Sequence, residues 1–136
     1  MSAVKSSQKV TQLQEAMIAL LSLCRESFTS IGLVSTHFTS IYKRTTIIRI
    51  ANSPVVVEDG EFRAEPAGEA EEKIIKIFVK TFVETLRSMA AVWGVRIISD
   101  HYKRLYIQLC EEFGDNKEAS KFLPSISPDK FKITRS

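Results

Sequence analysis

The chain has 136 residues, of which 44% are hydrophobic and 26% are charged, and its formal net charge is +3. This length and composition are typical of one globular domain with a buried core. The net charge is too small to indicate a nucleic-acid partner, and no apolar run approaches the ~20 residues of a membrane-spanning helix. We therefore expect a single domain without a membrane span.

The first part of the chain carries an apolar seam whose positions are spaced alternately three and four residues apart, as on one face of a helix. Its ten positions are Val10, Leu13, Met17, Leu20, Cys24, Ser27, Ile31, Val34, Phe38 and Ile41. All of them except Ser27 are apolar. The pattern predicts a long N-terminal helix from Ser6 or Ser7 toward Tyr42. Because hydroxyl residues and a glycine are poor in helix interiors, we expect a break near residues 30–32.

This seam also predicts self-association. It presents more apolar surface than one small domain with two other amphipathic helices can easily cover, which favours a homodimer. The expected interface residues are Val10, Leu13, Met17, Leu20 and Cys24. The alternative is that the seam folds back onto the helices of residues 69–113 of its own chain.

β-branched residues replace helix formers between the first helix and residue 65, which indicates strands. Residues 55–57 and 61–64 flank Glu58-Asp59-Gly60, and Asp-Gly suits a tight hairpin turn. Residues 46–50 are a further candidate strand. We expect a small antiparallel sheet that packs on the helices, since two strands alone are marginally stable.

Residues 69–114 form the longest stretch with helical periodicity. The apolar spacing predicts two amphipathic helices, or one helix bent at Gly94, and Gly114 marks the end. A third possibility is a continuous helix in which Gly94 packs closely against a neighbour. Short helical turns are expected after Asn116 and at Ser127-Pro128, with residues 1–5 and 130–136 loosely ordered. The predicted fold class is α+β, predominantly α, in one domain of residues 1–136.

The two cysteines, Cys24 and Cys110, each lie in an apolar helical context and not in a metal-binding or redox spacing. This pattern predicts small buried hydrophobic side chains in a reducing, cytoplasmic compartment. Single, scattered glycines form no phosphate-binding loop, and two histidines give no metal-ligand spacing. No cofactor and no metal are therefore expected.

No group of residues forms a catalytic signature, so we expect a protein that is not an enzyme. The leading hypothesis is a homodimeric protein–protein interaction or regulatory module. The alternative is a small-molecule sensing domain with an apolar pocket that includes Phe78, Met89 and Trp93. A third hypothesis is histidine phosphotransfer through His101, at the edge of a helical apolar face. The simpler explanation for His101 is a boundary histidine that hydrogen-bonds a neighbour.

Overall fold

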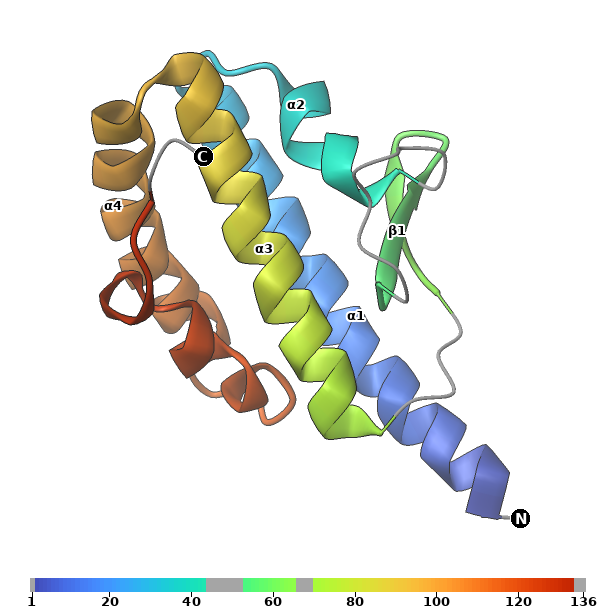
Figure 1. The fold of residues 1–136 in the computed structure, drawn as a ribbon. Helices are drawn as coiled ribbons and strands as arrows, with labels where there is room; N and C mark the ends of the chain where they lie inside the picture. The colour runs from blue at the N-terminus through green and yellow to red at the C-terminus, as the bar shows by residue number, and fades with distance from the viewer. Residues whose placement is uncertain (1, 44–52, 66–69, 134–136) are drawn as a thin grey trace.

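The computed structural model describes residues 2–43, 53–65 and 70–133, and three long helices form its body (Figure 1). They are α1 (Ser2–Ser30), α3 (Glu71–Trp93) and α4 (Val95–Phe113). α1 and α3 run in the same direction, and α4 returns along α3 (Figure 1). Since helices make up more than half of the chain and a small antiparallel sheet accompanies them, the predicted fold class is confirmed.

The first helix breaks where its hydroxyl-rich sequence predicts. α1 ends at Ser30, Gly32 adopts a φ of 92°, and the chain continues into the short helix α2 (Ser35–Thr39) and a 3₁₀ turn (Ser40–Tyr42). The left-handed φ of Gly32 favours glycine because a side chain is strained there. The helix begins at Ser2, earlier than the predicted Ser6 or Ser7.

The hairpin consists of β1 (Val55–Glu58) and β2 (Glu61–Ala64), paired antiparallel. Its two turn residues both have positive φ, 54° at Asp59 and 79° at Gly60, as a tight two-residue turn requires. The hairpin prediction is thus confirmed, while the candidate strand at residues 46–50 lies outside the described residues. The hairpin packs on α1, on the side away from α4 (Figure 1).

Gly94 separates α3 from α4. Its φ is 104°, and its N–H donates to the Ala90 carbonyl at 2.8 Å, which closes α3. A Cβ placed on Gly94 would meet no atom within 4 Å, so close packing does not explain this glycine. The prediction of two helices is confirmed, and the alternative of one continuous helix is wrong.

Beyond α4 the chain forms three 3₁₀ turns, Ala119–Lys121, Leu123–Ile126 and Pro128–Lys130. Asn116 Oδ1 accepts a hydrogen bond from the Ala119 N–H at 2.9 Å, as expected for a residue that starts a helical turn. The predicted C-terminal helical turns are therefore present.

The apolar seam of α1 lies in the core of the single chain. The side chains of Leu13, Met17, Leu20 and Cys24 have no exposed area, and the side chain of Val10 lies outside the described part. The expectation that this seam is open to a second chain needs correction, because β2, α2 and α4 all pack on α1. Of the helices in residues 69–113, to which the alternative assigned this role, α4 covers part of the seam, and α2 and the hairpin cover other parts.

The two cysteines differ in their surroundings. Cys24 is fully buried, but Cys110 is exposed, which corrects the prediction that both are buried. Cys110 follows the buried Leu109 by one residue, a step of about 100° around a helix that carries it off the apolar face. No helix in the described part of the chain is long and apolar enough to cross a membrane.

One buried amide ties the hairpin to α1. Gln14 Nε2 donates to the carbonyl of Pro54 at 2.8 Å and to that of Glu65 at 2.7 Å. These carbonyls flank β1 and β2, and the Glu65 N–H also donates to the Pro54 carbonyl at 2.9 Å. The side chain of Gln14 thus holds both open ends of the hairpin at one point on α1.

Replacing Gln14 by alanine is expected to lower the free energy of unfolding by about 1–3 kcal/mol, because it removes the amide that serves two carbonyls. Urea unfolding followed by circular dichroism measures the change. Gln12→Ala is the matched control, since Gln12 is exposed on the same helix and its loss should cost less than about 0.5 kcal/mol. Equal effects of the two substitutions would contradict the role given to Gln14.

Candidate functional site

The residues predicted to form an apolar pocket do not meet. Phe78 and Met89 lie in the core, where they are 1% and 0% exposed, and Trp93 is half-buried at the end of α3. Fifteen residues separate Phe78 from Trp93, which is about 22 Å along a helix. Phe78 packs against Phe122, at a ring distance of 4.9 Å, and contributes to stability.

His101 lies between α4 and α1. Its Nε2 is 2.8 Å from Ser27 Oγ, with which it forms a hydrogen bond, and its ring centroid is 5.0 Å from that of Phe28. The side chain is only 9% exposed, and Nδ1 is buried without a hydrogen-bond partner among the described residues. This environment is that of a histidine which joins two helices, the simpler of the two explanations considered above.

Burial lowers the pKa of His101 below its usual value, and the positive charge of Arg104 lowers it further. The hydrogen bond with Ser27 opposes these effects. A phosphoryl acceptor needs an accessible ring nitrogen, whereas here Nε2 is engaged by Ser27 and Nδ1 is buried. The geometry of His101 therefore gives no support to the phosphotransfer hypothesis.

A different feature stands out on the surface. Of the five large hydrophobic residues that are clearly exposed in the described part of the chain, four lie in or next to the connections at one end of the helices. Two belong to the connection between α1 and α2, and two flank the turn between α3 and α4. They are Ile31 (43% exposed), Val34 (58%), Val92 (58%) and Ile97 (54%).

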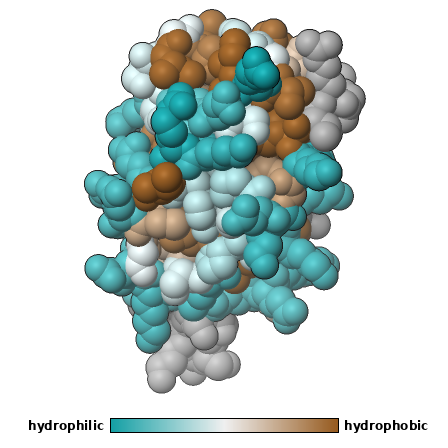
Figure 2. Space-filling model, turned by 90° about the vertical axis from the view of Figure 1, so that its left-hand side faces the viewer, coloured by the Kyte–Doolittle hydropathy of each residue, from teal (hydrophilic) through white to brown (hydrophobic). Residues whose placement is uncertain are grey.

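These residues define what we call the apolar end. α1 and α3 run in the same direction, so their C-terminal ends, with the connections that follow them, lie at the same end of the protein (Figure 1). Figure 2 shows hydrophobic surface gathered at this end, above a body that is mostly hydrophilic. Exposed apolar surface that is concentrated in this way indicates an interaction site more strongly than single scattered residues do.

Charge is sparse in the two segments next to the apolar end, although the exposed Arg96 precedes Ile97. Residues 27–42 and residues 88–95 contain no Asp, Glu, Lys or Arg, although a quarter of the whole chain is charged. Depletion of charge with enrichment of aromatic and aliphatic residues is the composition of the centre of protein–protein interfaces. Both segments share the depletion of charge, while residues 27–42 also contain many Ser and Thr side chains.

Contacts between α2 and α3 hold the apolar end in shape. The ring of His37 packs edge-on against Trp93, with centroids 4.8 Å apart, and His37 Nε2 lies 3.3 Å from Ser88 Oγ. These contacts fix the connection that carries Ile31 and Val34 relative to the end of α3. The end is therefore an ordered surface and not a pair of independent loops.

Sequence reasoning placed the interaction surface on the buried seam and missed this end. The available signal was the absence of charge in residues 27–42 and 88–95. Periodicity concealed it, because Ile31 and Val34 continue the seam of α1 by spacing. The break after Ser30 moves both residues out of the helix and into the solvent.

Within the described residues, no group of three or more His, Cys, Asp or Glu side chains is placed to hold a metal ion. No protein-family model matches the chain, and neither a curated protein nor a solved structure shows significant similarity to it.

The lowered pKa of His101 predicts a pH dependence of stability. The unfolded chain binds a proton near pH 6.5, and the folded chain binds it only at lower pH, so stability is complete above about pH 6.5 and decreases as the pH falls below it. His101→Gln should remove the part of this acid-induced loss of stability that protonation of His101 causes. Urea unfolding midpoints between about pH 7.5 and pH 5.5 measure it.

The matched control for this experiment is His37→Gln, which removes the other histidine and should leave the His101 component in place. Parallel loss of stability in the wild type and in His101→Gln would show that the folded environment does not lower the pKa of His101.

Proposed function

We propose that this protein is a non-catalytic interaction module that acts as a homodimer, with the apolar end as its interface. The observation that supports the proposal is the gathering of Ile31, Val34, Val92 and Ile97 on a surface without charged residues in its two connections. Covering such side chains removes apolar area from water, at about 25 cal/mol for each Å².

A second copy of the chain is the partner that this surface fits best. In a two-fold dimer the same surface meets itself, so any charge on it faces an equal charge unless the two are offset. Residues 27–42 and 88–95 add no such repulsion, and Arg96 beside Ile97 is a single charge, whereas the hairpin turn brings the three acidic residues Glu58, Asp59 and Glu61 together. The distribution of charge thus favours self-association through the apolar end over self-association through the hairpin.

The size of the surface is compatible with a dimer. A stable interface takes about 800 Å² from each partner, which is about a tenth of the 7767 Å² that one chain exposes. One whole end of a molecule with three long helices can supply this area. Trp93, half-buried beside Val92, adds an aromatic side chain of the kind that dominates binding energy in interfaces.

The dimer predicts a mass of twice 15.3 kDa in solution. Val34→Glu and Val92→Glu should each weaken association at least about tenfold, because they place an unpaired charge in the interface. Light scattering coupled to size exclusion, over about a hundredfold range of protein concentration, measures the mass and the dissociation constant.

Ile107→Glu is the matched control. Ile107 is 61% exposed, as much as Val92, but it lies midway along α4 and outside the apolar end. This variant should remain dimeric, and circular dichroism should show that all three variants fold. A wild-type mass of one chain at every concentration would overturn the proposal, as would a dimer that Ile107→Glu dissociates and Val92→Glu does not.

A further inference from the structure

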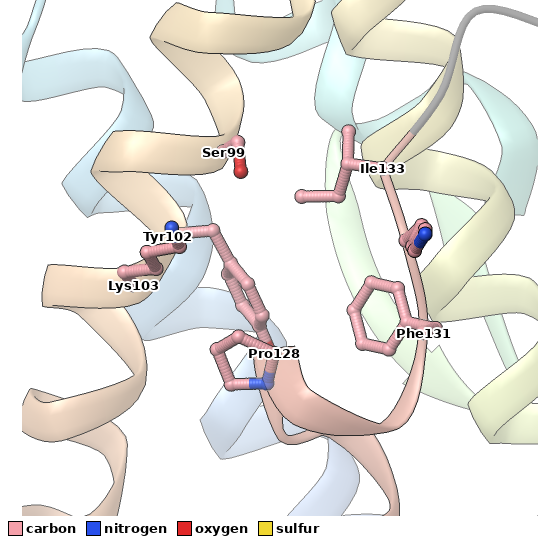
Figure 3. Close-up of a pocket in the computed structure, with 7 residues that line it drawn as sticks. Ser99, Tyr102, Lys103, Pro128, Phe131 and Ile133 are labelled. Atoms are coloured by element: carbon pink, nitrogen blue, oxygen red, sulfur yellow. The ribbon is translucent and has the colours of Figure 1, made fainter.

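A cavity of about 290 Å³ lies between α4 and the C-terminal segment, on a different part of the surface from the apolar end (Figure 3). α4 contributes Ser99, Tyr102 and Lys103 to its lining. In Figure 3 the hydroxyl of Ser99 points into the space between α4 and the chain that follows the last 3₁₀ turn.

The opposite wall comes from the C-terminal segment. Phe131 and Ile133 project from it toward α4, and Pro128 closes the space on one side (Figure 3). Lys132 lies between Phe131 and Ile133 and also lines the cavity. The walls are therefore aromatic and aliphatic, with a hydroxyl on one side and two lysines in the lining.

The walls are held in place by contacts that do not depend on a ligand. Tyr102 is buried, and its hydroxyl donates to the carbonyl of Ile126. The ring of Phe131 lies 6.0 Å from that of Tyr102, and Arg87 Nε donates to the Lys132 carbonyl at 3.2 Å. The segment that forms the second wall is thus anchored to both α4 and α3, and the cavity is preformed.

The charged residues that line the cavity favour a negatively charged ligand. Both charged side chains in it, Lys103 and Lys132, are cationic, and no acidic residue lines the cavity. In the described part of the chain neither lysine has a carboxylate within ion-pair distance. Burial raises the pKa of Tyr102, so its hydroxyl stays neutral and adds no negative charge to the wall.

We propose that this cavity binds a small aromatic carboxylate. The ring of the ligand lies against Phe131 and Ile133, which present the apolar surface of the cavity above the buried Tyr102. The carboxylate lies toward Ser99 and the lysines, which donate hydrogen bonds and supply positive charge. A volume near the lower limit for ligand pockets restricts the ligand to a single ring with a short chain.

The test uses three probes of one shape and different charge: 3-phenylpropanoate, 3-phenylpropanamide and 3-phenylpropylamine. Titration of the ¹⁵N-labelled protein, followed by amide chemical shifts, should give a dissociation constant of about 1 mM or below for the acid. The amide should bind about threefold to tenfold more weakly, and the amine more weakly still, because exposed lysines contribute modest attraction. The shifts should centre on Ser99, Lys103 and Ile133.

Two variants separate the apolar and the ionic contributions. Ser99→Leu fills the cavity from α4 and should abolish binding of all three probes. Lys103→Gln with Lys132→Gln should bring the affinity of the acid down to that of the amide. Lys76→Gln with Lys80→Gln is the control, because it removes the same charge from exposed positions on α3 that do not line the cavity.

No localised shift at about 10 mM acid would overturn the proposal. Equal affinity for acid and amide, or unchanged binding by Ser99→Leu, would overturn it as well. The result does not depend on dimerisation, because the cavity and the apolar end share no residue, so each proposal can fail while the other holds.

Discussion

Burial of the apolar face of α1 is the constraint on which the fold depends. Leu13, Met17, Leu20 and Cys24 are covered completely, and α4, α2 and the hairpin each cover a part of this helix. A two-stranded hairpin is marginal in water, and α2 is a single turn and a half, so neither is expected to be stable without the surface that α1 supplies. A substitution on this face therefore affects every other element.

Polar contacts fix the positions of the hairpin and of α4 on α1. Hydrophobic burial is non-directional, so by itself it fixes neither the location of the hairpin nor the rotation of α4. Gln14 holds the two ends of the hairpin at one point on α1, and the hydrogen bond between His101 and Ser27 joins α4 to the end of α1. The side chains of Gln14 and His101 are both buried, where a missing partner is costly.

The two proposed binding surfaces follow from how the helices end. α1 and α3 point the same way, so their uncharged C-terminal connections form one apolar surface (Figure 1). The cavity arises on the side of α4, where Tyr102 and Arg87 hold the returning C-terminal segment across α4 and α3. The two proposed surfaces share no residue, so both can be occupied in one molecule.

The sequence by itself determined the elements, because their signals are local: the spacing of apolar residues, Asp59-Gly60 at the hairpin turn, and Gly94 between two helices. Which surfaces remain open was decided only by tertiary structure. Periodicity shows that a helix has an apolar face but not what covers it, so the seam of α1 resembled an interface, and Phe78 and Trp93 resembled one pocket. The cavity joins Ser99 to Ile133 across two elements, a contact that no local pattern contains.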